Sequence, residues 1–272
     1  MSRLSEAILE VKSLKTVFKD KHKELTVVDG IDLAIGPNEV VALVGESGCG
    51  KSMTSLNPVL TIGLQMTEGL RKHLKVSRVK AISIADEWLR KVGFPEPARI
   101  RKEFPHRLSG GMRQRVMLAM AMACQPDLLI ADEPTTALDV TIQAQVLDLI
   151  RGLIQDSEMS VLFITHDLGV VAEMATRVVV MYAGQVVETT DVKTLFTNPL
   201  HPYTKGLLQS TPRMQGAIEK LVPIPGTVPP AGRFPEGCRF ADRCPIATEA
   251  CRAEVPGLRE IVPGHQVRCI RV

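Results

Sequence analysis

The architecture of this chain is built around one stretch, Val40-Val41-Ala42-Leu43-Val44-Gly45-Glu46-Ser47-Gly48-Cys49-Gly50-Lys51-Ser52. Its apolar half is typical of a buried strand, and the rest matches the phosphate-loop pattern of Gly, four residues and Gly-Lys-Ser. The glycines let backbone N–H groups face inward where the next helix begins, and the dipole of that helix favours an anion. We therefore expect this loop to hold a polyphosphate, with Lys51 on its terminal phosphates and Ser52 on a magnesium ion.

Composition and charge exclude several classes of protein. The chain has 272 residues, 45% of them hydrophobic, and a formal net charge of +3. This charge is too small to indicate a nucleic-acid partner, and no long run of consecutive basic residues appears. The first residues lack the basic and apolar regions of a signal peptide, and no apolar run approaches the ~20 residues of a membrane helix. We expect a cytoplasmic protein that meets a membrane only through a partner.

A second strand of the predicted core ends in acidic residues. Leu128-Leu129-Ile130-Ala131 is apolar and leads into Asp132-Glu133-Pro134. Asp132 at the strand tip suits an outer-shell magnesium ligand, and Glu133 suits a general base that polarises the attacking water. A further strand, 160–165, ends at His166, which could hydrogen-bond a terminal phosphate.

Two other segments fit the same chemistry. Ser109 is a good N-cap for a helix up to Cys124. Gly110 and Gly111 have no side chains to cover their backbone amides, which can therefore hold an anion. Asp139 follows the acidic strand and precedes a helix that runs to about residue 155. Upstream, Phe18 lies in a predicted strand, where it is either a base-stacking aromatic or an ordinary core or strand-face residue.

Together these motifs resemble the ATP-binding subunits of ABC transporters. The residues 53–58 (Met-Thr-Ser-Leu-Asn-Pro), 104–107 (Phe-Pro-His-Arg) and 201–204 (His-Pro-Tyr-Thr), and a Cys-bearing tail, resemble the oligopeptide/dipeptide importer branch. The resemblance implies an α/β P-loop ATPase core, with a mostly parallel sheet flanked by helices, over residues 1–190. It also implies an irregular family-specific extension over 191–272.

The resemblance further implies partners and location. Two such subunits, identical or different, would sandwich two ATP molecules with Mg²⁺. The backbone amides of Ser109, Gly110 and Gly111 in one subunit would complete the ATP site of the other. The pair would drive two integral-membrane permeases, supplied indirectly by an extracytoplasmic peptide-binding protein. The chain would then lie at the cytoplasmic face of the inner membrane as a peripheral subunit.

The chain departs from this family at one point. Ser52 abuts Met53, whereas several tens of residues separate these motifs in the family, including a glutamine that senses magnesium and contacts the permease. We interpret this as an internal deletion after the Walker A motif, which shortens the domain between 52 and 58. Gln65 falls beyond the run and is expected in a helix, so it is no substitute. Hydrolysis and coupling are therefore expected to be weakened or lost if the fold survives.

The tail is rich in proline and holds four of the six cysteines, Cys238, Cys244, Cys251 and Cys269. Five, six and seventeen residues separate successive cysteines of this set. These gaps do not match the paired Cys-x-x-Cys of a zinc ribbon. Four thiolates suit a [4Fe–4S] cluster or zinc about equally, and incidental free thiols are the plain alternative. The resemblance favours the cluster.

Three functions remain in view. The first is an ATPase subunit that energises peptide import, favoured by Glu133 and His166. The second is a nucleotide-binding partner without turnover in the same transporter, favoured by the missing glutamine. The third, a soluble ABC protein acting in DNA repair or translation, is disfavoured by the single ATPase cassette and the tail.

Overall fold

The computed structural model describes residues 7–20, 23–45, 56–136, 138–211 and 222–272. These fall into two compact units, one of residues 1–50 and 161–272 and the other of residues 51–160. The second unit interrupts the first in sequence at Lys51, within the predicted phosphate loop.

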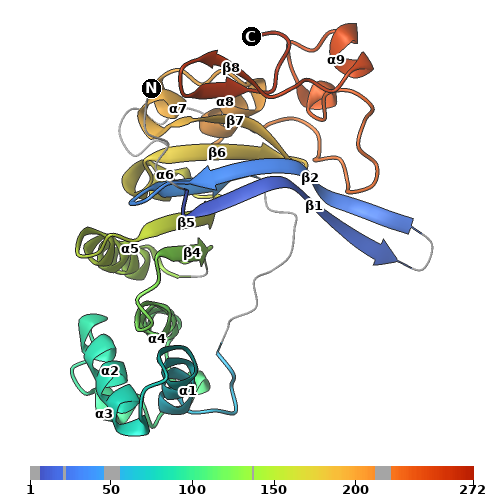
Figure 1. Cartoon of the computed structure of the whole chain (residues 1–272). Coiled ribbons are helices and arrows are strands. Elements are labelled where there is room, and N and C mark those ends of the chain that lie inside the picture. The colour runs from blue at the N-terminus through green and yellow to red at the C-terminus, as the bar shows by residue number, and fades with distance from the viewer. Residues whose placement is uncertain (1–6, 21–22, 46–55, 137, 212–221) are drawn as a thin grey trace. The chain divides into compact units, whose positions relative to one another are not determined.

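A mixed sheet organises the first unit. Within this unit the neighbouring strands follow the order β5-β3-β6-β7-β9-β8, of which β5, β6, β7 and β8 are labelled in Figure 1. The bounds are β3 Val40–Val44, β5 Ser160–Thr165, β6 Arg177–Tyr182, β7 Gln185–Asp191, β8 Arg259–Val262 and β9 His265–Val267. β3 pairs in parallel with β5 and β6, which is the pairing expected of a P-loop core. The β6–β7, β7–β9 and β8–β9 pairs are antiparallel. The sheet is mixed because a tight hairpin joins β6 to β7 and the tail adds the last two strands.

A long antiparallel ribbon forms a second, two-stranded sheet in this unit. It consists of β1, Leu9–Asp20, and β2, Lys23–Ile35, with register shifts between Val11 and Val17. At the shift, Ser13 has a φ of 50° and its N–H donates to Asp32 Oδ1 at 2.7 Å. Phe18 lies in β1, in agreement with the strand that the sequence predicted there.

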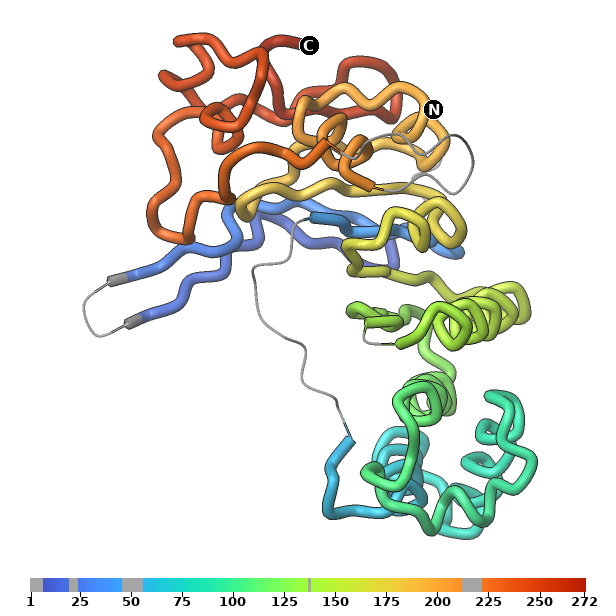
Figure 2. The backbone as a smooth tube through the Cα atoms, turned by 180° about the vertical axis from the view of Figure 1, so that it is seen from behind, coloured from blue at the N-terminus to red at the C-terminus, as the bar shows by residue number. Residues whose placement is uncertain are grey.

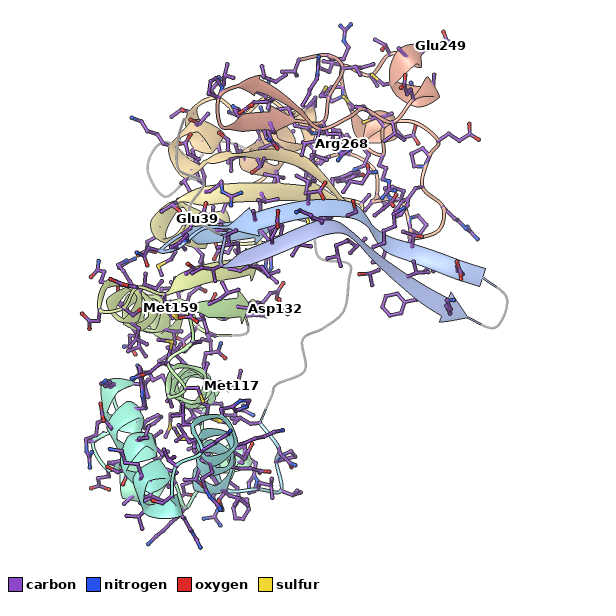
Figure 3. The ribbon with its side chains drawn as sticks, viewed as in Figure 1. Glu39, Met117, Asp132, Met159, Glu249 and Arg268 are labelled. Atoms are coloured by element: carbon purple, nitrogen blue, oxygen red, sulfur yellow. The ribbon has the colours of Figure 1, made fainter. Side chains whose placement is uncertain are left out.

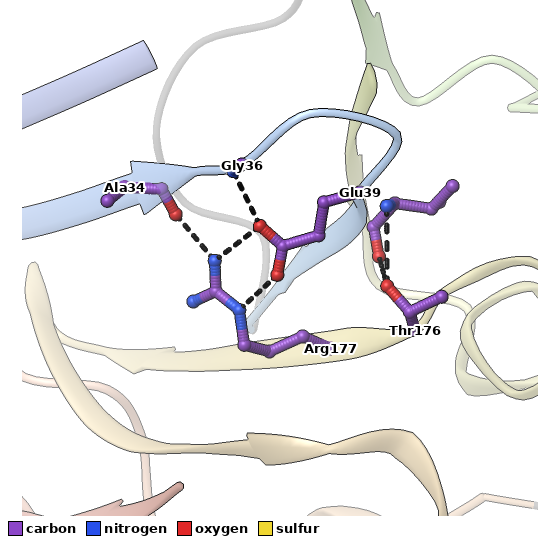
Figure 4. Close-up of polar contacts among 6 residues, drawn as sticks. Ala34, Gly36, Glu39, Thr176 and Arg177 are labelled. Atoms are coloured by element: carbon purple, nitrogen blue, oxygen red, sulfur yellow. Dashed lines mark hydrogen bonds and ion pairs between the residues drawn. The ribbon is translucent and has the colours of Figure 1, made fainter. Parts of the chain in front are cut away.

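An ion pair fixes the entry into β3 (Figure 4). Arg177 at the start of β6 donates to both carboxylate oxygens of Glu39, at 2.6 and 3.2 Å, and also to the carbonyl oxygen of Ala34. The N–H of Gly36 donates to Glu39 Oε2 at 2.8 Å, which closes the turn from β2 into β3. Burial raises the pKa of Glu39, but the Arg177 and Gly36 donors outweigh it and hold that pKa below its usual value.

The remaining elements of this unit are short. They are α6 Leu168–Met174, α7 Val192–Thr197, α8 Pro202–Gln209, the 3₁₀ turn η2 Ala241–Arg243, and α9 Glu249–Ala253. Residues 222–258 follow an otherwise irregular path (Figure 2). The sequence predicted this irregularity but not β8 and β9, which are too short to show an alternating pattern.

The second unit is mainly helical. Its elements are α1 Ile62–Leu74, α2 Arg78–Lys91, α3 Pro97–Ile100, the 3₁₀ turn η1 Pro105–Arg107, α4 Gly110–Met122, β4 Leu128–Asp132 and α5 Val140–Gln155. One apolar core joins the helices, with Leu70, Ala85, Leu89 and Val116 at most 1% exposed. Arg101 clamps α3 to α2 through Asp86, with Nε 2.5 Å from Oδ1. Gln65 lies in α1, as predicted.

Candidate functional site

The strand that leads into the phosphate loop is almost completely buried. Val41 and Ala42 are 0% exposed and Val44 is 2% exposed. A Cβ on Gly45 would lie 2.7 Å from the carbonyl oxygen of Met181, so only glycine fits where β3 ends. The other predicted loop residues, Glu46 to Ser52, lie outside the described residues, and their roles stay predictions.

The predicted signature segment caps a helix, as expected. Ser109 Oγ accepts a hydrogen bond from the N–H of Met112 at 3.3 Å and so starts α4. Ser109 and Gly110 are exposed, whereas Gly111 is buried. A Cβ on Gly111 would lie 2.5 Å from Ile142 Cγ2, so this glycine lets α4 approach α5 closely. The geometry leaves the exposed start of α4 open to an anion.

The acidic strand carries both of its carboxylates to its tip. Asp132 ends β4 (Figure 3) and is exposed, whereas Glu133 after it is half-buried. Glu133 has a φ of 44°, a left-handed backbone conformation that residues other than glycine rarely adopt. The Thr136 hydroxyl donates to Glu133 Oε2 at 2.7 Å, and the Thr136 N–H donates to the Glu133 carbonyl oxygen at 3.1 Å. This turn holds the carboxylate in one place at the cost of backbone strain, as functional sites often do.

Asp139 and His166 occupy positions next to helix starts. Asp139 is the N-cap of α5, where its Oδ1 accepts from the N–H of Ile142 at 3.0 Å. His166 is exposed directly after β5, as predicted, and Asp167 behind it caps α6. His166 belongs to the first compact unit, whereas the acidic strand and the signature segment belong to the second. Their joint action on one nucleotide stays a prediction.

Phe18 is not a core residue, because its side chain is 62% exposed on β1. Phe18 is therefore an exposed strand-face residue, and its stacking on a base stays a prediction.

The four tail cysteines line one cavity. Its walls are His201, Pro202, Cys238, Phe240, Ala241, Cys244, Cys251, Pro256, Cys269, Ile270 and Arg271. Cys251 and Cys269 are buried, and the N–H of Cys238 donates to the Cys251 carbonyl oxygen at 2.8 Å. All five cysteines within the described ranges are free thiols. The tertiary structure therefore brings together four side chains that are far apart in the sequence.

The thiols differ in acidity. Burial raises the pKa values of Cys238 and Cys244, and negative charge on neighbouring thiols raises them further. Hydrogen bonds from Thr248 lower the pKa of Cys251. Within the described part of the chain, no three His, Cys, Asp or Glu side chains are placed so that they could hold a metal ion as they stand. A ligand shared by these thiols would require them to shift and to deprotonate.

Sequence reasoning gave His201 no role. It is 1% exposed, lines the cysteine cavity, and accepts at Nδ1 from the N–H of Tyr203 at 3.1 Å. Burial lowers its pKa to about 4, so the ring is neutral at pH 7. Its position before Pro202 is the sequence signal for a helix N-cap.

Comparison with known proteins places these features in context. The ABC transporter family matches residues 55–136, and the oligopeptide/dipeptide transporter C-terminal region matches residues 187–251. The chain is 48% identical over 314 residues to the oligopeptide transport ATP-binding protein AppD of Bacillus subtilis, covering 96% of each chain. It is 41% identical over 314 residues to the dipeptide transport ATP-binding protein DppD of Escherichia coli, covering 97% of this chain and 96% of DppD.

A third relative has a longer alignment. The chain is 46% identical to a putative peptide import ATP-binding protein of Brucella melitensis over 334 positions, with 100% of this chain and 98% of the relative covered. Because this chain has 272 residues, part of that relative has no counterpart here.

Solved structures agree on the fold. The dimeric bacterial ABC transporter cassette MJ0796 has a TM-score of 0.59 at 22% identity, covering 67% of this chain and 98% of the cassette. A second structure of that cassette, bound to ADP and phosphate after hydrolysis, has a TM-score of 0.58 at 21% identity.

Proposed function

This chain belongs to the ATP-binding proteins of the oligopeptide/dipeptide branch of ABC transporters, and on that premise we propose that it energises import of di- and oligopeptides by binding and hydrolysing ATP. The observation that carries this proposal is the 48% identity to an oligopeptide transport ATP-binding protein over 96% of the chain. The cassette fold and the tail region of the same family support it.

The proposed nucleotide site is made of residues with separate tasks. The loop residues Gly45, Glu46, Ser47, Gly48, Cys49, Gly50, Lys51 and Ser52 bind the phosphates through their backbone N–H groups and the Lys51 ammonium. Mg²⁺, held by Ser52 and through water by Asp132, would neutralise phosphate charge when bound. Glu133 orients and polarises the attacking water, and His166 donates to the terminal phosphate. The strained turn that fixes Glu133 supports its part in this assignment.

We propose that a second ATPase subunit completes the site. The N–H groups of Ser109, Gly110 and Gly111 at the start of α4 would bind the nucleotide held by the partner, and Asp139 would lie at the contact between subunits. In the described part of the chain no helix is both long and apolar enough to cross a bilayer. Peripheral attachment to two permease subunits at the inner face of the membrane follows from the proposal, with peptide delivered by an extracytoplasmic binding protein.

The alternative is a subunit that binds ATP without turning it over. The direct junction of Ser52 and Met53 is the reason to test it, but the identity to peptide transport ATP-binding proteins favours the energising role. An internal deletion after the phosphate loop would remove a strand of the core and the glutamine that couples magnesium to the permease.

We propose the domain division 1–190 and 191–272 on the same resemblance.

One measurement separates the two functions. The full chain is reconstituted with its partner ATPase and permeases in proteoliposomes, and ATP binding, ATP turnover and peptide uptake are measured on the same preparation. Peptide-stimulated turnover supports the energising role, and binding without turnover supports the alternative. A folded chain that binds no magnesium nucleotide even with its partners would refute both.

We also propose that the cysteine cavity holds a [4Fe–4S] cluster, with zinc as the other candidate. The support is chemical, because thiolates are the usual ligands of both, and four thiols line one cavity. When bound, either group would link the parts of the tail that carry these four cysteines. Cys238, Cys244, Cys251 and Cys269 would be the ligands, and deprotonation of Cys238 and Cys244, whose pKa values are raised, would accompany binding.

A further inference from the structure

A cluster of cations lies at the turn between α1 and α2, which pack against each other in the second unit (Figure 1). The segment from Arg71 to Lys80, called the basic turn here, contains Arg71, Lys72, Lys75, Arg78 and Lys80. No Asp or Glu lies between Glu68 and Asp86 in the sequence. The turn is therefore far more basic than the chain as a whole, whose net charge is +3.

Every residue of the basic turn except Val76 is exposed. The structure shows no ion pair for any of its five cations with another described residue, although it shows such pairs for Lys91, Arg99, Arg101 and Arg107 in the same unit. The charge of the basic turn is thus available to a partner.

Local helix preferences do not explain the cluster. Arg71 and Lys72 suit the C-terminal end of α1, but Arg78 and Lys80 lie in the first turn of α2, where the positive end of the helix dipole disfavours cations. Lys75 has a φ of 53° at a C-cap that glycine or asparagine normally fills. Residues that break local rules in this way are typical of functional surfaces.

Two apolar side chains stand among the cations. Leu74 is 40% exposed and Val79 is 80% exposed. The turn itself is firmly supported, because Leu70 before it and Ala81 after it are buried in the helical core. The helix pair therefore presents cations and apolar side chains together on a fixed scaffold.

We infer that the basic turn docks on a bilayer surface of anionic phospholipid. Lys and Arg side chains bind the headgroup phosphates, and Leu74 and Val79 enter the boundary between headgroups and acyl chains. A single-stranded nucleic acid would favour aromatic side chains for base stacking, and the basic turn has no Phe, Tyr or Trp. This inference goes beyond ATP-driven import and does not depend on turnover.

The experiment is co-sedimentation of the full chain with phosphatidylcholine vesicles that contain or lack phosphatidylglycerol, at low and high salt. We expect binding only to the anionic vesicles, weakened by salt. Replacing all five cations by Gln should weaken binding about tenfold or more. The matched control replaces five other exposed cations of the same unit, Arg90, Lys91, Arg99, Lys102 and Arg107, by Gln, and should change binding by about twofold at most.

Two further variants keep the result interpretable. Arg78→Gln with Lys80→Gln removes charge that disfavours α2, so it should keep the fold, checked by circular dichroism, and still weaken binding several-fold. Leu74→Ser with Val79→Ser should weaken binding while leaving its salt dependence. Equal binding to neutral vesicles, equal loss in the control variant, or tighter binding to an oligonucleotide than to anionic vesicles would each overturn the inference.

Discussion

Glu188 Oε1 lies 2.7 Å from His265 Nε2, and this contact joins β7 of the core sheet to β9 of the tail. Glu188 is 0% exposed and His265 is 2% exposed. The same carboxylate accepts from the N–H of Leu200 at 2.7 Å and from the N–H of His201 at 3.0 Å. One buried side chain thus fixes both the segment that leads into α8 and strand β9 of the tail.

Replacing Glu188 by Ala should destabilise the protein by about 3 kcal/mol or more, because three donors, two of them buried, would lose their acceptor. Glu188→Gln should cost less, since its amide oxygen can still accept. The free energy of unfolding, from urea titration followed by circular dichroism, measures both. The exposed Glu158→Gln is the control, with a change of about 0.5 kcal/mol at most. Equal stability of all three variants would contradict this account.

The β6–β7 hairpin turn should not tolerate a side chain at Gly184. Its φ is +79°, and a Cβ there would lie 2.0 Å from the carbonyl oxygen of Val27. Gly184→Ala should therefore cost roughly 2 kcal/mol or more. The matched change is Gly69→Ala in α1, where nothing lies within 4 Å of an added Cβ, and it should stabilise by up to about 1 kcal/mol. Thermal melts of the two variants should move in opposite directions.

Stability should fall in acid partly through Glu39. Its folded pKa is lowered from 4.5 by Arg177 and Gly36 against the opposing effect of burial, so the unfolded chain binds its proton more readily. The contribution is present above about pH 4.5 and is lost as pH falls below that value. Glu39→Gln should lower stability at pH 7 and make it less dependent on pH below 4.5. The free energy of unfolding is measured by urea titration at several pH values. If its dependence on pH were the same in Glu39→Gln as in the unchanged protein, the ion pair would not be responsible.

Glu133→Gln should lower kcat for ATP by about 10²-fold or more in the reconstituted transporter, because it removes the proposed base. ATP binding should persist, since the change keeps the side-chain shape. Glu158→Gln is again the control and should leave kcat unchanged. Turnover that survives in Glu133→Gln would assign the base elsewhere.

Anaerobically purified protein should carry iron and acid-labile sulfide and absorb near the blue edge of the visible spectrum. Cys244→Ser should lose most of this absorbance, because one of four ligands is removed. Cys124→Ser should keep this absorbance, because Cys124 follows the C-cap of α4 and does not line the cavity. Zinc without iron would support the other candidate, and neither metal in the intact chain would leave the four thiols as structural side chains.

The sequence by itself determined the local parts of this protein. The apolar run before Gly45, the Ser109 cap, and the acidic strand tip follow from short-range patterns, and each lies in the predicted element. The same patterns carried the resemblance to the peptide-importer family, which the comparisons confirm.

Only the tertiary structure decided the features that depend on residues distant from one another in the sequence. It exposed Phe18, gathered four cysteines in one cavity, and joined Glu188 to His265 across 77 positions of sequence. Local periodicity reports which face of an element is buried, whereas these contacts arise when strands and loops far apart in the chain pair and exclude water together.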